Sequence, residues 1–364
     1  MLLSPVVRLR SEGIDGLRAI LALWVLLAHA VPWSVATGQA PTFLSDVAAV
    51  LQRSFQPAGE THPAVLAFIV LSGYCIHRNG MRLNTTVDMR RYAVRRFFRI
   101  YPVYGLAILA GVVGLAISMD HAPGLAAGLS GTSGITAACV AAKALGIPSL
   151  VTMPHGCSFQ GNAPLNTVMA EMWLYAAYPV LLIGVGARWG ERGIWRVVLA
   201  VWVAGIAAMT LDRSLTPWWH NTSFCGFLAY WWIGAKAVDP EDGAPIRRAW
   251  RWLLAGWVLL SVPLVLHWAD WPAVVELRKM VFAILVAMLI SRIDRSRIPL
   301  GWLSVLGAAG YSIYAFHAPV VYTLLIYGVP LWATVLAAVC LGLAGYRWVE
   351  RPCMRVGVVG YSPR

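Results

Sequence analysis

The fold of this chain is decided by its first apolar segment, Ile14-Asp-Gly-Leu-Arg-Ala-Ile-Leu-Ala-Leu-Trp-Val-Leu-Leu-Ala-His-Ala-Val-Pro-Trp-Ser-Val-Ala36. The segment is long enough to cross a bilayer as a helix, yet it contains Arg18 and His29. Eleven residues separate these two, so a helix returns to within about 20° of its starting direction and both side chains lie on one face. An ionisable group inside a membrane span is costly and marks a candidate functional site. With Asp15 on the same stripe, this face is predicted to form one wall of a reaction channel.

Apolar segments of similar length recur along the whole chain. Hydrophobic residues make up 59% of the 364 residues and charged residues only 12%, and the mean hydropathy is +0.67. Soluble domains are about one quarter charged. The composition therefore predicts an all-α, polytopic helical membrane protein with about ten transmembrane helices. The spans are expected near residues 14–36, 62–77, 100–118, 164–186, 194–211, 222–238, 250–268, 272–290, 301–327 and 329–348.

The net charge of +13 follows this expected topology rather than indicating a nucleic-acid partner. If both termini are cytoplasmic, 24 of the 29 Lys and Arg residues fall in cytoplasmic segments, as the positive-inside rule requires. A cleavable signal is the competing interpretation of the N-terminus, and the two ionisable residues of the first span argue against it. The basic residues left on the outer side or within a span are Arg53, Lys143, Arg213, Arg278 and Lys279.

The domain organisation is expected to be simple, with one membrane-embedded domain over 1–355 and a short cytoplasmic tail over 356–364. The six cysteines show no spacing typical of a zinc site, so neither a metal nor a permanently bound cofactor is predicted. Cys75, Cys225 and Cys340 fall in apolar spans and are interpreted as packing residues. The sequence leaves open whether Cys139 and Cys157 form a disulfide. Both lie in the outer segment 119–163, where a short re-entrant or interfacial helix is expected.

A basic stretch precedes the third span. Arg91, Arg95 and Arg99 are spaced four residues apart, with Arg96 beside them, so they form a ridge along one helix. One interpretation is an anchor to anionic lipid. The other is a clamp for the phosphates of a cytoplasmic cofactor, because arginine grips phosphate through a planar fork of donors.

Polar residues also interrupt the spans farther along the chain. Glu171 shares a helix face with Tyr175, and it is predicted to pair with Arg18, to orient His29 or to anchor helix packing. Two further pairs of residues each have two possible interpretations. Ser72 and Tyr74 mark either a packing notch or a substrate contact. His317, on one face with Tyr314, either contacts the acceptor or bonds a neighbouring carbonyl.

Six motifs, in chain order, resemble those of the family 3 acyltransferases, integral-membrane enzymes that commonly O-acetylate sugars. One departure is Asn166-Thr-Val, where the family often has Trp-Ser-Leu. The motifs are Ile14-Asp-Gly-Leu-Arg-Ala-Ile with His29 (Arg-x10-His), Phe68-Ile-Val-Leu-Ser-Gly-Tyr, Arg96-Phe-Phe-Arg-Ile-Tyr-Pro-Val-Tyr, Ala170-Glu-Met-Trp-Leu-Tyr, Tyr311-Ser-Ile-Tyr-Ala-Phe-His and Tyr346-Arg-Trp-Val-Glu-Arg-Pro.

The resemblance implies an enzyme of the cell (inner) membrane that transfers an acyl group, most often acetyl, from cytoplasmic acyl-CoA to a hydroxyl of an envelope carbohydrate or glycolipid. Histidine suits general base work near neutral pH, so His29 is expected to be the base, with Arg18 and Glu171 orienting groups or balancing charge. Direct transfer is favoured over an acyl-enzyme because no serine or cysteine lies at helical spacing beside His29, and a relay through an acyl-histidine stays open as the alternative.

The remaining assignments complete this hypothesis. A transporter of a sugar-lipid or organic anion is the alternative function, and a non-catalytic scaffold is a weaker one. The sequence names neither the acceptor nor the oligomeric state. The residues expected to bind the donor are Arg95, Arg96, Arg99 and Tyr104, and those expected at the acceptor or channel are Asp15, Ser72, Tyr74, Tyr175, Tyr314 and His317.

Overall fold

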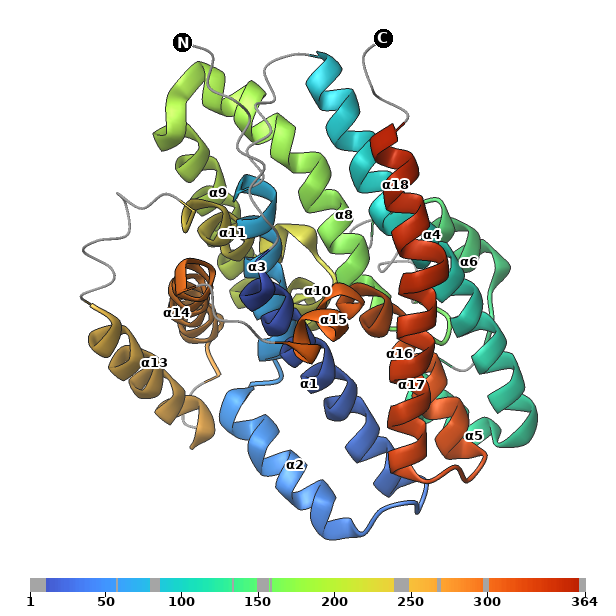
Figure 1. Cartoon of the computed structure of the whole chain (residues 1–364). Coiled ribbons are helices and arrows are strands. Elements are labelled where there is room, and N and C mark those ends of the chain that lie inside the picture. Colours follow the sequence, from blue (N-terminus) through green and yellow to red (C-terminus); the bar gives the residue numbers. More distant parts are fainter. Residues whose placement is uncertain are drawn as a thin grey trace.

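The computed structural model describes residues 11–56, 58–78, 86–132, 134–148, 157, 159–238, 249–266, 270–296 and 301–359, and these ranges contain helices but no strand (Figure 1). The predicted tail lies outside the described residues from 360 onward. Several arginines of the predicted cytoplasmic set also lie outside them, namely Arg8, Arg10, Arg82, Arg247, Arg248, Arg297 and Arg364.

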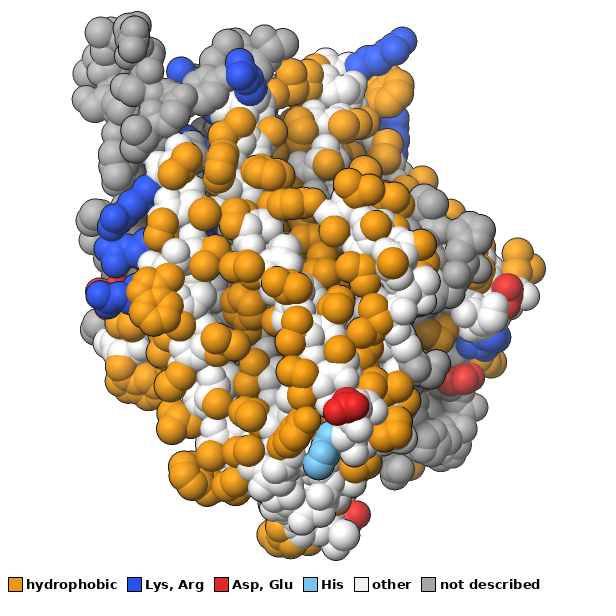
Figure 2. Space-filling model, turned by 90° about the vertical axis from the view of Figure 1, so that its right-hand side faces the viewer, with side chains coloured by type: hydrophobic (Ala, Val, Ile, Leu, Met, Phe, Trp, Pro, Cys, Tyr) orange, Lys and Arg blue, Asp and Glu red, His pale blue; other side chains and the backbone are white. Residues whose placement is uncertain are grey.

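Four helices in the described ranges are long and apolar enough to cross a membrane, or five if one bent pair counts as a single span. They are Glu12–Ala36, Asp88–His121, Leu165–Leu211 and Leu331–Val356, and the bent pair is Trp302–Ala308 with Gly310–Ile326. Figure 2 shows the matching surface, a broad apolar band with Lys and Arg gathered mainly toward one end. The chain is therefore a helical membrane protein, whereas the count of ten spans and the cytoplasmic termini stay predictions.

Helix α1 (Glu12–Ala36) crosses the middle of the bundle (Figure 1). It contacts α3 (Pro63–Arg78) and α14 (Pro272–Ser296) on one side, and α15 (Trp302–Ala308), α16 (Gly310–Ile326) and α17 (Leu331–Gly345) on the other. The approach of α15 is very close, since a Cβ on Gly307 would lie 1.5 Å from the Asp15 carbonyl oxygen. Only glycine fits there, and α1 is thereby fixed against α15.

A second close crossing joins α3 to α11 (Phe224–Lys236). A Cβ on Gly73 would lie 1.9 Å from the Trp231 carbonyl oxygen, and one on Gly234 would lie 1.9 Å from that of Val70. Two glycines thus let the helix backbones touch, as small residues do in membrane helix pairs. The contact holds α3 in register with its neighbours.

Helix α4 (Thr86–His121) contains both the basic ridge and the third predicted span. The η4 turn (Tyr346–Glu350) and α18 (Arg351–Val359) follow α17, and α18 packs along α4. The Arg99 Nη1 donates to Met354 Sδ at 3.1 Å across this contact. The arginines of the basic ridge therefore lie on a helix that packs against α18, and not on a loop.

Two predicted spans differ from the structure. The span over 301–327 is wrong as one helix, because α15 and α16 meet at a bend of 71°. The span over 164–186 extends a few residues farther than predicted. Helix α8 (Leu165–Pro179) continues through the π-helical η2 (Val180–Gly186) into α9 (Ala187–Leu211), and Gly190, with φ 63°, breaks the helix between the predicted spans over 164–186 and 194–211. Glycine tolerates this backbone conformation without a Cβ clash.

The structure also contains α2 (Thr42–Phe55), an amphipathic helix packed on α1 that was not among the predicted elements. The remaining helices are shorter or peripheral. They are α5 (Pro123–Ser130), η3 (Arg213–Leu215), α10 (Thr216–Asn221) and α13 (Trp250–Val265).

A short helix forms in the segment 119–163 as expected, namely α6 (Ala137–Ala144). The structure also settles the cysteine question, because Cys139 and Cys157 form a disulfide. The end of α6 is capped by side chains of α4 and α8. Tyr104 donates to the Lys143 carbonyl at 2.8 Å, and Trp173 Nε1 donates to that of Gly146 at 3.1 Å. These donors satisfy carbonyls that a helix end leaves without partners.

The two basic residues that the topology left unexplained in α14 are buried and paired. Arg278 and Lys279 are each 2% exposed. Lys279 Nζ lies 2.8 Å from the carboxylate of Glu276, and Arg278 pairs with Glu60. Removing one partner of such a pair leaves an uncompensated buried charge. These charges hold α14 in place and lie apart from the cavity described next.

Candidate functional site

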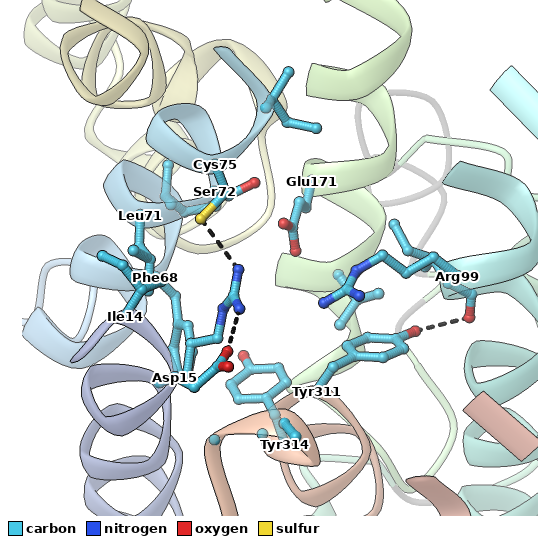
Figure 3. Close-up of a pocket in the computed structure, with 18 of the residues that line it drawn as sticks. Ile14, Asp15, Phe68, Leu71, Ser72, Cys75, Arg99, Glu171, Tyr311 and Tyr314 are labelled. Carbon is cyan, nitrogen blue, oxygen red and sulfur yellow. Dashed lines mark hydrogen bonds and ion pairs between the residues drawn. The ribbon is translucent and has the colours of Figure 1, made fainter. Parts of the chain in front are cut away.

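One cavity of about 500 Å³ opens among α1, α3, α4, α8 and the α15–α16 bend. Its size falls within the range of about 300–1,000 Å³ that is common for small-molecule sites. Figure 3 shows labelled residues from these helices turned toward one space, with Asp15 and Cys75 on one side and Glu171 and Arg99 across from them. Five arginines and two carboxylates line it, Arg18, Arg78, Arg95, Arg96 and Arg99 with Asp15 and Glu171.

On the α1 side, Arg18 is held between two neighbours. Its Nη1 donates to Asp15 Oδ1 at 2.7 Å, one turn earlier, and its Nη2 donates to Cys75 Sγ at 3.1 Å on α3 (Figure 3). Asp15 is buried at 2% exposure, so the pair compensates a charge that would otherwise be costly. Cys75 packs against the hydrophobic core, as its interpretation as a packing residue expected, and in addition its side chain lines the cavity.

On the opposite side, a chain of hydrogen bonds leads to Glu171. The Tyr175 hydroxyl donates to Glu171 Oε1 and lies 2.9 Å from Ser72 Oγ. Because the Tyr175 proton goes to the carboxylate, Ser72 is the donor to Tyr175, and Trp231 Nε1 in turn lies 3.3 Å from Ser72 Oγ. The chain fixes the Glu171 carboxylate in the cavity. Predicted residues from α3 and α8 meet here.

The basic ridge forms one end of the cavity. Arg96 lies over the ring of Tyr175 at 5.5 Å, and Arg99 contacts Met354. In the described part of the chain Arg95, Arg96 and Arg99 form no ion pair, whereas Arg78 pairs with Asp294 at 3.0 Å. Three arginines with donors free of carboxylate partners thus give this end a positive potential suited to an anion.

The other end of the cavity closes at Tyr314 and Phe68, whose ring centroids are 5.9 Å apart. His29 does not line the cavity, and neither does His317. The two histidines lie beyond Tyr314, with ring centroids 5.1 Å apart. Arg18 and His29 both face α16, in agreement with their predicted position on one face of the helix. The channel wall predicted along this face is not continuous, because the cavity ends at Tyr314 and Phe68 before it reaches His29.

Two further predicted residues lie outside the cavity. Tyr104 is fully buried and caps α6, and the Tyr74 hydroxyl donates to Asp294 at 2.7 Å. Conversely, sequence reasoning missed Arg78, Cys75 and Tyr311 on the cavity lining. A signal for Cys75 was available, because it follows Ser72 by about one helical turn and so lies near the same face, and Arg78 follows Cys75 at the same spacing.

No group of three or more metal-ligating side chains in the described ranges lies close enough to hold an ion. What the cavity offers is a cationic end, a guanidinium fixed by a carboxylate, and a second carboxylate fixed by a tyrosine. Such an arrangement can bind a large anionic molecule and hold its neutral portion beside fixed charges.

Comparison with known proteins agrees with this description. A model of the family 3 acyltransferase domain matches residues 11–346, nearly the whole chain. No match was found among curated proteins or among solved structures. The matched range contains every cavity residue on α1, α3, α4, α8 and α16. This chain belongs to the family 3 acyltransferases, and it is a membrane enzyme that transfers acyl groups.

Proposed function

We propose that the protein is an O-acyltransferase that moves an acyl group, most often acetyl, from cytoplasmic acyl-CoA to a hydroxyl of a carbohydrate or glycolipid of the cell envelope. One observation carries the proposal. A cavity joins three arginines without carboxylate partners to the fixed pair of Arg18 and Asp15. Acyl-CoA has the matching polarity, with phosphates at one end and a neutral thioester at the other.

In this proposal Arg95, Arg96 and Arg99 bind the phosphates of the donor. Their guanidinium groups present several donors in a planar fork, which suits phosphate oxygens. The pantetheine arm then follows the cavity past Arg18 and Glu171 toward Phe68 and Tyr314. The arrangement also accounts for the net positive lining, which a lipid anchor on the outer surface would not need.

The reaction we propose is direct transfer. His29 takes the proton from the acceptor hydroxyl, the hydroxyl oxygen attacks the thioester carbonyl, and the C–S bond breaks to give the ester and the CoA thiolate, which receives the proton. Because His29 lies beyond Tyr314, the thioester must reach past the Phe68–Tyr314 contact to meet it. Arg18 and Glu171 orient the arm and balance charge before that point.

An acyl-enzyme is the alternative route, and Ser72 and Cys75 on the cavity lining are candidate nucleophiles for it. Incubation with isotope-labelled acetyl-CoA without acceptor, followed by peptide mass spectrometry, separates the routes. Direct transfer predicts no acetyl mass on the peptide that carries these residues. A stoichiometric acetyl group on Cys75 or Ser72 would overturn it.

The function itself is tested by CoA release. The purified protein in lipid nanodiscs receives acetyl-CoA and a panel of envelope oligosaccharides and glycolipids, and free thiol is measured. Acceptor-dependent release together with an acetyl ester on the acceptor supports the proposal. A transporter of a sugar-lipid or organic anion would move label across a sealed vesicle without cleaving the thioester.

A further inference from the structure

The described residues include a histidine pair that the cavity does not explain. His29 on α1 and His317 on α16 approach each other with His317 Nε2 3.1 Å from His29 Nδ1. His317 is fully buried, while His29 keeps partial exposure. Two backbone carbonyls also contact the pair. The Val25 oxygen lies 3.0 Å from His29 Nδ1, and the Tyr314 oxygen lies 2.6 Å from His317 Nδ1.

These contacts determine where the protons are. A carbonyl oxygen only accepts, so each Nδ1 must carry a proton and donate it to its carbonyl. A neutral His317 protonated at Nδ1 has a lone pair at Nε2. That lone pair faces the Nδ1–H of His29, which is shared between the Val25 carbonyl and His317. A neutral His29 protonated at Nδ1 then carries its own lone pair at Nε2.

We infer that His317 is a positioning residue that holds His29 in the Nδ1–H tautomer, with Nε2 as the atom that accepts the proton from the acceptor hydroxyl. The inference rests on the proposed function of His29 as base. His317 does not itself line the cavity and acts through His29 alone. It also helps once His29 is protonated, because the imidazolium keeps an acceptor at its Nδ1–H.

The groups around His29 indicate that His317, and not a carboxylate, holds the tautomer of His29. The groups that face His29 are the rings of Trp33 and His317, with His62 nearby at the start of α3. No described carboxylate forms a hydrogen bond or ion pair with either histidine of the pair. Catalytic histidines are commonly oriented by a third group, and a neutral imidazole with an anchored proton can fill that role.

The first test reads the tautomers directly and needs no activity. ¹⁵N-histidine-labelled protein in nanodiscs is compared with His29→Gln and His317→Gln to assign the two rings. At a pH where both rings are neutral, we expect a proton on Nδ1 and a bare Nε2 for each, the opposite of the form usual for histidine in water. A proton on Nε2 of His29 would overturn the inference even if the enzyme transfers acyl groups.

The second test separates positioning from packing by two variants. In His317→Gln the longer amide places its oxygen near the position of Nε2 and still accepts from His29. In His317→Asn the shorter amide can still donate to the Tyr314 carbonyl but does not reach His29. We expect kcat within about 3-fold of wild type for the first and about 10- to 150-fold lower for the second, the loss of a hydrogen bond to a charged group. The KM for the donor stays unchanged in both.

Equal kcat in the two variants would overturn the role of His317. If both variants are inactive, their size-exclusion profile and melting temperature decide, since two well-folded inactive proteins also contradict the inference. If both variants misfold, the tautomers measured in the wild-type protein decide whether His317 has this role. If the wild-type protein transfers no acyl group, the proposed function is wrong. The tautomer measurement still tests the effect of His317 on His29, because it needs no activity.

Discussion

Replacement of Arg99 gives the sharpest test of the donor site. Arg99 lines the cavity, forms no ion pair among the described residues and makes one side-chain hydrogen bond there, to Met354 Sδ. Its removal therefore breaks no ion pair. A hydrogen bond to a charged group contributes about 1.5–3 kcal/mol, which corresponds to about a 10- to 150-fold change in affinity. We expect Arg99→Ala to weaken acetyl-CoA binding by that factor.

The assay is calorimetric titration of the purified protein with acetyl-CoA, with acetylpantetheine as a donor that lacks the nucleotide phosphates. Arg99→Ala should lose affinity for the first ligand and not for the second, because only the first has phosphates to bind. Arg99→Lys should recover part of the loss, since lysine keeps the charge but lacks the planar fork.

Arg355→Ala is the matched control, because Arg355 is exposed on α18 near the same end and does not line the cavity. It should leave both affinities unchanged. The reasoning is refuted if Arg99→Ala binds acetyl-CoA as tightly as the control, or if it weakens both ligands equally. The first outcome would make the ridge a determinant of topology alone.

Three further predictions concern the base, the disulfide and the topology. His29→Ala should lower the transfer rate by about 10²–10⁴-fold while membrane insertion, followed by fractionation, is unchanged; a loss of only a few-fold would argue against a base. Reduction of the Cys139–Cys157 disulfide, which closes a loop with a sequence separation of 18, should lower stability by about 3 kcal/mol, and an unchanged melting temperature after full reduction would contradict this. In sealed right-side-out vesicles, Arg90→Cys at the start of α4 should be protected from an impermeant thiol reagent and Asp120→Cys at its end should react. Labelling of both from outside would reverse or remove the proposed sidedness.

The sequence determined the class of this protein and much of its site, for a local reason. Hydrophobic runs and the spacing of residues within one helix are properties of neighbouring positions, so the all-helical membrane fold and the shared face of Arg18 and His29 could be predicted. The same holds for Glu171 with Tyr175 and for the arginine ridge. Each of these pairs lies on a single helix, where periodicity alone fixes which side chains are neighbours.

Tertiary structure decided how those faces meet. The 71° bend after α15 and the contact of Gly307 with Asp15 bring α16 across α1, and no periodicity encodes such a crossing. That crossing seals the cavity at Tyr314 and pairs His317 with His29, residues that are 288 positions apart. Cys75 of α3 reaches the cavity wall beside Arg18 of α1, whereas Tyr104 of α4 is directed to the end of α6. Which face of a helix meets a cavity depends on the packing of distant helices, and a hydrophobic pattern cannot distinguish a neighbouring helix from lipid.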